Sequence, residues 1–203
     1  MTLFEYDEAV RNSVGGSVCG IDEAGRGPLA GDVYAAAVIF DPDVVIEGIN
    51  DSKKLSEKKR ELLYDEIIAK AKAYCVATAS VAEIDEINIL QATFLAMKRA
   101  YDGLGISADM ILVDGNRKPF GDDEVVTVVK GDGTSASIAA ASILAKVSRD
   151  RYMKQLAEKY PQYQFEKHKG YGTKLHYEML EKYGVSDVHR KTFLKKIIGD
   201  ASR

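Results

Sequence analysis

Short apolar runs alternate along this chain with longer segments in which apolar residues recur every three or four positions. The short runs are bounded by glycine, proline or acidic residues, as buried strands often are. They predict strands at 18–21, 33–40, 44–49, 74–81, 111–113 and 125–129. The periodic segments predict helices within 1–16, after an N-cap at Ser56, and at 84–101, 134–160, 174–183 and 190–198. Strands that alternate with helices, the first of them joined by tight turns, indicate an α/β fold with a mixed sheet.

The segment 18–40 carries the first candidate chemistry. Its opening strand leads directly into two carboxylates, Asp22 and Glu23. Turn-favouring residues separate these acids from the next strand: Gly25, Gly27, Pro28 and Gly31. This order predicts a hairpin that presents acidic side chains at one edge of a sheet. Acids in so apolar a setting are costly unless they are paired or bound to a metal, and the density of glycine favours a site over two solvated turn residues.

Two further acids, Asp114 and Asp132, come where other predicted strands end beside glycine. If those strands neighbour the first, four carboxylates converge and raise one another's pKa. Hard divalent cations relieve such repulsion, and two of them clamp the reacting oxygens of a phosphodiester. The pattern therefore predicts a site for Mg²⁺ or Mn²⁺. Because neighbouring residues on a strand face opposite sides, we expect the strand to end or bulge at Asp22 and Glu23.

Composition and charge narrow the class of protein. With 46% hydrophobic and 29% charged residues among 203, the chain suits one globular domain, residues 1–203, ending in a basic helical portion from about residue 160. Residues 142–203 hold 14 Lys and Arg against 7 Asp and Glu, whereas residues 1–141 hold 14 against 24, which favours a polyanion-binding surface beside the acidic body. Cys19 and Cys75 are expected as buried hydrophobes. Without a signal peptide or a membrane span, we expect a cytoplasmic protein.

Other candidate sites are weaker. The glycine-rich segment at 131–142 leads into a helix but lacks the Gly-Lys-Ser/Thr ending of a nucleotide-binding loop, which disfavours an NTPase or kinase. Ser135 and Ser137 have no His or Asp partner nearby in sequence, so a hydrolase triad has no support. The histidines lack zinc-protease spacing and are expected to be surface or packing residues: His168, His176 and His189.

Six segments, in order, resemble motifs of ribonuclease HII, the bacterial type 2 ribonuclease H: GIDEAGRGPLAGDVYAAAVI, DSKKLSEKKR, ILVDG, KGDGTSASIAAASILAKVSRDRYM, HKGYGTKLHYEML and HRKTF. The resemblance runs over residues 17–194. It implies the ribonuclease H-like fold, a five-stranded mixed sheet flanked by helices, here with a small helical C-terminal extension. We expect the chain to lack the extra N-terminal domain of ribonuclease HIII, and KGYGTKLH looks bacterial rather than eukaryotic.

The resemblance also implies an activity. It is that of a Mg²⁺- or Mn²⁺-dependent endonuclease that cuts the RNA strand of RNA/DNA hybrids and cuts 5′ of ribonucleotides embedded in duplex DNA. The products carry 3′-hydroxyl and 5′-phosphate ends, and the role is removal of ribonucleotides from DNA. The enzyme is expected to be a monomer. Carried over by position, the catalytic, metal-binding acids are Asp22, Glu23, Asp114 and Asp132. The residues expected to bind substrate are Gly25, Arg26, Gly27, Lys53, Lys146 and Tyr171.

Two alternatives stay open. Another two-metal nuclease on the same fold, such as a junction resolvase or a transposase core, would share the acids but not the glycine-arginine-glycine turn with a distal tyrosine. A non-catalytic nucleic-acid-binding module is disfavoured by the intact set of acids. Metal-dependent cleavage of a duplex that contains one ribonucleotide separates these possibilities.

Overall fold

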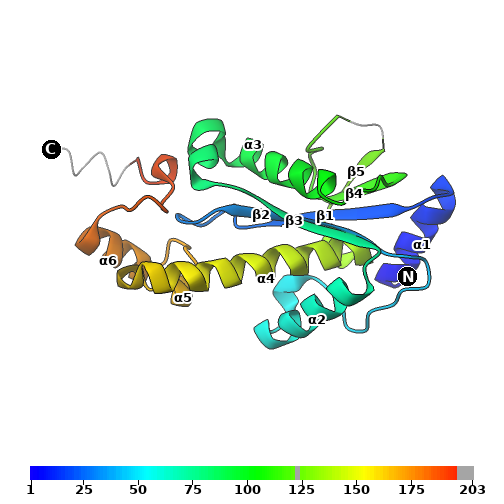
Figure 1. Ribbon diagram of the computed structural model, residues 1–203, viewed down its shortest axis with the longest axis horizontal. Coiled ribbons are helices and arrows are strands. Elements are labelled where there is room, and N and C mark those ends of the chain that lie inside the picture. Colours follow the sequence, from blue (N-terminus) through cyan, green and yellow to red (C-terminus); the bar gives the residue numbers. More distant parts are fainter. Residues whose placement is uncertain (122–123, 196–203) are drawn as a thin grey trace.

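A five-stranded mixed sheet forms the centre of the computed structural model, which describes residues 1–121 and 124–195 (Figure 1). The spatial order is β3-β2-β1-β4-β5, with β2 antiparallel to both β1 and β3, and β4 parallel to both β1 and β5. The strands are β1 (Val18–Ala24), β2 (Val33–Ile39), β3 (Ala73–Ala79), β4 (Met110–Asp114) and β5 (Val125–Val128). The predicted mixed sheet with an antiparallel hairpin side is confirmed.

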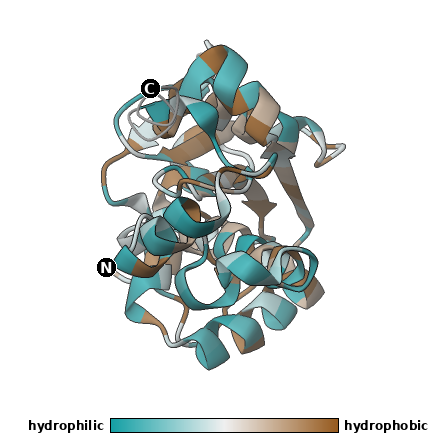
Figure 2. Ribbon diagram, turned by 90° about the vertical axis from the view of Figure 1, so that its left-hand side faces the viewer, coloured by the Kyte–Doolittle hydropathy of each residue, from teal (hydrophilic) through white to brown (hydrophobic). Residues whose placement is uncertain are grey.

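Helices cover both faces of the sheet. Figure 1 shows α3 on one side and the long α4, with α2, on the other. The helices are α1 (Leu3–Val14), α2 (Glu57–Lys70), α3 (Val81–Asp102), α4 (Ala136–Lys159), α5 (Phe165–His168) and α6 (Lys174–Tyr183). Two buried apolar clusters fill the layers between helices and sheet, one on the α3 side and one on the side of α2 and α4. Figure 2 shows hydrophobic residues along the interior strands and mainly hydrophilic residues on the outer helical turns.

Close packing of β1 on α4 explains why α4 begins with small residues. A Cβ added to Gly20 would lie only 2.1 Å from the carbonyl carbon of Ser137, so the strand and the helix backbone are in direct contact. Ala139, Ala140 and Ala141 follow in the helix and are fully buried. Larger side chains here would push α4 away from the strand that carries Asp22.

The predicted strand at 44–49 is wrong, because this segment is irregular. Both sides of β2, the strand that precedes this segment, are already paired, with β1 and β3, so the segment cannot pair with β2. The apolar character of the segment is explained by Ile46 and Ile49, which are buried in the cluster on the α2 and α4 side. The strand predicted at 74–81 ends earlier, at Ala79, because Ser80 caps α3 in a capping box with Glu83.

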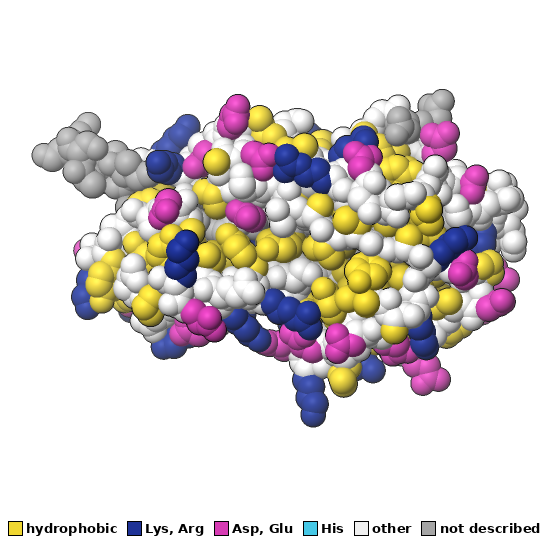
Figure 3. All heavy atoms as spheres, in the orientation of Figure 1, with side chains coloured by type: hydrophobic (Ala, Val, Ile, Leu, Met, Phe, Trp, Pro, Cys, Tyr) yellow, Lys and Arg dark blue, Asp and Glu magenta, His cyan; other side chains and the backbone are white. Residues whose placement is uncertain are grey.

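The C-terminal portion agrees with expectation in part. The helix predicted at 174–183 is confirmed as α6. Of the helix predicted at 190–198, Lys191–Phe193 forms a single 3₁₀ turn, and residues 196–198 lie outside the described residues. Figure 3 shows apolar side chains in a band across the middle of one face, at the edge strand β3, with charged side chains above and below it. None of the described helices is long and apolar enough to cross a membrane.

Candidate active site

Asp22, Glu23 and Asp114 lie at one edge of the sheet because β1 is longer than its parallel neighbour. Pairing of β1 with β4 ends at Ile21 and Val113, whereas pairing with β2 continues to Ala24. The last residues of β1 therefore extend past the end of β4, where Asp114 stands. Together with the turn that follows β1, the three acids line a cleft of ≈ 250 Å³.

Asp22 and Glu23 share this cleft in a different way from the one predicted. The strand neither ends nor bulges there, because both residues keep regular partners on β2. Asp22 lies on the face that packs on α4, like Gly20, and Glu23 lies on the α3 face, like Ile21. Both carboxylates reach the cleft because β4 has ended, so the edge of β1 is open between the two faces.

Asp132 is brought to this edge by a backbone hydrogen bond to Asp114. The N–H of Gly131 donates to Asp114 Oδ1 over 2.6 Å. Asp132 therefore sits on the 3₁₀ turn Gly131–Gly133, and not at the end of β5 as the sequence suggested. It lines a second cleft of ≈ 560 Å³, which shares Asp114 and Lys53 with the first.

Burial, together with neighbouring like charges, raises the pKa of three of these carboxyl groups. Burial, followed by the charges of Glu23 and Asp114, raises the pKa of Asp22 well above its usual value. Burial also raises the pKa of Glu23, although Arg26, whose guanidinium lies 3.4 Å from its carboxylate, opposes the shift. The pKa of Asp132 is raised by burial and then by Asp114. This end of the sheet therefore carries an excess of negative charge.

The donor set at this edge fits a hard divalent cation. Its members are all carboxylates, which are the ligands that Mg²⁺ and Mn²⁺ prefer. Zinc sites, in contrast, are usually rich in His and Cys. Among residues 1–121 and 124–195, no three His, Cys, Asp or Glu side chains stand close enough to enclose a metal by themselves. Mg²⁺ usually keeps several water ligands and accepts substrate phosphate oxygens, so one or two protein carboxylates suffice to hold it.

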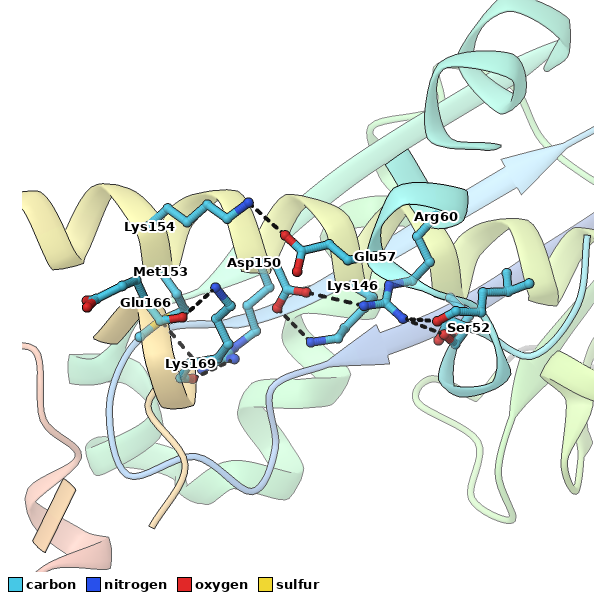
Figure 4. Close-up of polar contacts among 12 residues, drawn as sticks. Ser52, Glu57, Arg60, Lys146, Asp150, Met153, Lys154, Glu166 and Lys169 are labelled. Atoms are coloured by element: carbon cyan, nitrogen blue, oxygen red, sulfur yellow. Dashed lines mark hydrogen bonds and ion pairs between the residues drawn. The ribbon is translucent and has the colours of Figure 1, made fainter. Parts of the chain in front are cut away.

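The two predicted lysines lie at the cleft, and an ion network supports their surroundings. Lys53 Nζ is 4.0 Å from Asp132, and Lys146 Nζ donates to the buried Asp150 over 2.6 Å. Figure 4 shows Arg60 directed at the other carboxylate oxygen of Asp150, 4.0 Å away, and donating to the backbone carbonyl of Ser52. Arg60 thereby holds the segment with Lys53 against α4.

The glycine turn and Tyr171 meet at the rim of the same cleft. Gly25 has φ +96°, which side chains rarely tolerate, and a Cβ there would lie 2.1 Å from Arg149 Nε. A Cβ on Gly27 would be 3.6 Å from the Tyr171 ring. The Tyr171 side chain is 44% exposed, so its ring is available to a bound molecule.

The sequence predicts that the histidines are surface or packing residues, and the structure buries all three, which makes them packing residues. The rings of His168 and His176 stack with centroids 4.3 Å apart, and His176 Nε2 lies 3.0 Å from His189 Nε2. Sequence reasoning missed the buried Arg149 and Arg190 beside them. For Arg149 the available signal was the helical row 145, 149, 153, in which an arginine interrupts inward-facing apolar positions.

This cluster predicts acid sensitivity of the fold. Burial is the main reason why the pKa of His176 and of His189 falls to about 4, and the neighbouring imidazoles add to it. The unfolded chain binds protons at these imidazoles between about pH 6.5 and 4, whereas the folded chain does not, so the free energy of unfolding should decrease as pH falls through that window. The groups facing the pair are His168, the Ser186 hydroxyl and Asp187.

Urea unfolding of the parent and of His189→Asn at several pH values measures this effect. The variant should lose less stability between pH 7 and pH 4.5 than the parent, because it has one titrating imidazole fewer. The carboxyl groups with raised pKa values act in the opposite direction in both proteins, so the difference between the two isolates the histidine. Equal pH dependence in both would contradict the prediction.

A sequence model of the ribonuclease HII family matches residues 19–196. The chain belongs to the ribonuclease HII family. It is similar to ribonuclease HII of Caldicellulosiruptor bescii, with 56% identity over 195 residues that cover 96% of this chain and 95% of the relative. Ribonuclease HII of a Shewanella species is 57% identical over 183 residues, 88% of each chain. The family resemblance is thus confirmed, and the chain is a type 2 ribonuclease H, an endoribonuclease that acts on RNA paired with DNA.

Solved structures agree with this assignment. The ribonuclease H2 of Pyrococcus horikoshii superimposes with a TM-score of 0.72 at 29% identity, over 87% of this chain and 93% of that one. Bst-RNase HIII, solved in complex with Mn²⁺, has a TM-score of 0.66 at 19% identity, over 83% of this chain and 63% of that one, and shows the fold alone. The predicted ribonuclease H-like fold is confirmed.

Proposed function

We propose that this ribonuclease HII is a Mg²⁺- or Mn²⁺-dependent endonuclease that cuts the RNA strand of RNA/DNA hybrids and cuts 5′ of ribonucleotides embedded in duplex DNA. Its products would carry 3′-hydroxyl and 5′-phosphate ends, and its role would be removal of ribonucleotides from DNA. One observation carries the proposal: the acids of β1 and β4, the turn 25–27 and Tyr171 line a single cleft.

In this proposal the four acids, Asp22, Glu23, Asp114 and Asp132, hold the divalent cations. When bound, such ions activate the attacking water and stabilise charge on the leaving oxygen. The carboxylates orient the ions, and burial of Asp22 keeps its side chain fixed on β1. Lys53 and Lys146 bind the nucleic-acid backbone next to the acids, where their charge offsets the phosphates.

The turn 25–27 supplies the choice of RNA over DNA. The 2′-hydroxyl is the group that directly distinguishes ribose from deoxyribose. Glycines at 25 and 27 let backbone N–H and C=O groups approach it closely, and the turn follows Glu23 by two residues. The Tyr171 ring stands beside Gly27, so that it can stack on the adjoining sugar or base.

The decisive experiment uses a DNA duplex that contains one ribonucleotide, incubated with the protein and Mg²⁺, Mn²⁺ or EDTA. We expect a single cut 5′ of the ribonucleotide with either metal, a 3′-hydroxyl on the upstream product, and no cut with EDTA or in an all-DNA duplex. Cleavage of a four-way DNA junction instead would identify a resolvase. Binding without cleavage under every metal condition would identify a non-catalytic module and reject the proposal.

A further inference from the structure

Two buried guanidinium groups hold the loop that contains the turn 25–27, which we call the recognition turn. Arg190 is 0% exposed, and Arg149 is 1% exposed. Arg190 donates to the carbonyl oxygens of Gly25 (2.6 Å), Arg26 (2.9 Å) and Gly31 (2.7 and 2.9 Å). Within the described chain, the hydrogen bonds of its side chain therefore all go to the backbone of this one loop.

Arg149, on α4, completes the set of bonds to the loop. It donates to the carbonyl oxygens of Ala30 (3.1 Å) and Asp32 (3.3 Å), and also to that of Lys169 (3.1 Å), next to the segment with Tyr171. A buried guanidinium needs acceptors for its N–H donors. If either arginine lost these carbonyl oxygens, the cost of burying its charge would no longer be offset. The hydrogen bonds of Arg149 and Arg190 therefore fix the conformation of this loop.

A chain of imidazoles reaches Tyr171 from the residue before Arg190. The N–H of Ser186 donates to His189 Nδ1 over 3.1 Å, which places the proton of this ring on Nε2. His189 Nε2–H then donates to His176 Nε2 over 3.0 Å. The remaining proton of His176 is on Nδ1, which donates to the Tyr171 carbonyl over 2.9 Å. The tautomers of His189 and His176 therefore both follow from the N–H of Ser186, the donor at the start of this chain of imidazoles.

Backbone bonds join the same three segments. The N–H of Leu29 donates to the Gly170 carbonyl, and the N–H of Arg190 donates to the Leu29 carbonyl, each over 2.8 Å. His189 forms a bridge with Ala30. The loop 25–32, the segment 168–172 and the dipeptide His189–Arg190 thus form one bonded unit, which we call the recognition unit.

We infer that His189–Arg190 is the positioning element of this unit: Arg190 fixes the turn 25–27, and His189 fixes Tyr171 through His176, so that both present one geometry to a ribonucleotide. The inference rests on the proposed function and adds to it a dipeptide that touches no substrate. A single embedded ribonucleotide offers only one productive register, whereas every nucleotide of an RNA strand offers a 2′-hydroxyl. Loss of positioning should therefore impair cleavage at a single ribonucleotide more than cleavage of a continuous hybrid.

Arg190→Lys and Arg190→Gln test this with single-turnover rates at saturating enzyme on both substrates. The ratio of the single-ribonucleotide rate to the hybrid rate should fall at least about tenfold in both variants, because one ammonium cannot replace a fork bonded to three carbonyls. The matched control is Leu63→Ala, which removes a buried side chain from α2, remote from the unit. A structural loss of this kind should lower both rates together and leave the ratio unchanged.

Hydrogen–deuterium exchange supplies a readout that does not depend on activity. Amides of 25–32 and 168–172 should exchange at least about tenfold faster in Arg190→Gln than in the parent, while those of α2 stay unchanged. An unchanged rate ratio together with unchanged exchange would overturn the inference, as would full rescue by Arg190→Lys. If the parent protein cuts neither substrate, the proposed function fails, and the exchange experiment still decides whether Arg190 positions the loop.

Discussion

Asp22→Asn should abolish cleavage and leave the fold intact. The amide has nearly the same shape as the carboxylate but is a poorer ligand for a hard cation. Loss of metal-assisted stabilisation of the transition state, several kcal/mol, corresponds to a rate at least about 10³-fold lower. Asp132→Asn should behave alike, because it removes the carboxylate on the other side of Asp114.

The substitution Asp22→Asn should not destabilise the protein in the absence of metal. Asp22 is 5% exposed and its pKa is raised by burial and by Glu23 and Asp114, so a neutral side chain removes a repulsion. We expect its melting temperature in EDTA to equal or exceed that of the parent. Calorimetric titration with Mn²⁺ should show weaker binding to the variant.

A matched control is Asp109→Asn, at the opposite end of β4. Its carboxylate accepts hydrogen bonds from Ser17, which an amide oxygen can still accept, and it lies outside both clefts. This control should cleave at the parental rate. Near-parental turnover in Asp22→Asn itself would remove Asp22 from the metal set.

Tyr171→Ala should sharply reduce cleavage at a single embedded ribonucleotide. A stacking contact with a nucleic acid contributes ~1–3 kcal/mol, which corresponds to roughly 5- to 150-fold in rate. The exposed ring beside Gly27 has no core to support, so the fold and metal binding should be retained. Arg149, whose guanidinium carbon lies 6.0 Å from the ring centroid, remains in place beneath it.

Tyr171→Phe separates the ring from its hydroxyl. If stacking dominates, Phe should retain most of the activity that Ala loses; if the hydroxyl contacts the ribose, both variants should be impaired. Tyr74→Ala, which removes another exposed tyrosine from the edge strand β3, serves as the control. If Tyr171→Ala cuts the single-ribonucleotide duplex as fast as the parent, Tyr171 is a packing residue, and its proposed role in recognition is wrong.

The sequence by itself determined most of the elements and the family. Local signals sufficed where a short apolar run met a glycine, as at Asp114, or where a capping residue began a helix, as at Ser56. These signals act over a few residues and carry the same meaning in any fold. The segment 44–49 misled because burial and strand formation give the same apolar run, and only the occupied edges of β2 distinguish them.

Tertiary structure alone decided how the acids meet and what supports the recognition turn. Asp22 and Glu23 share a cleft because β4 is shorter than β1, a relation between two strands about 90 residues apart that periodicity cannot contain. In sequence Arg190 looks like a solvated charge, and only the apolar row 145, 149, 153 indicates that Arg149 is buried. Their partners are carbonyl oxygens, which every residue possesses, so only the folded backbone reveals what the two arginines hold.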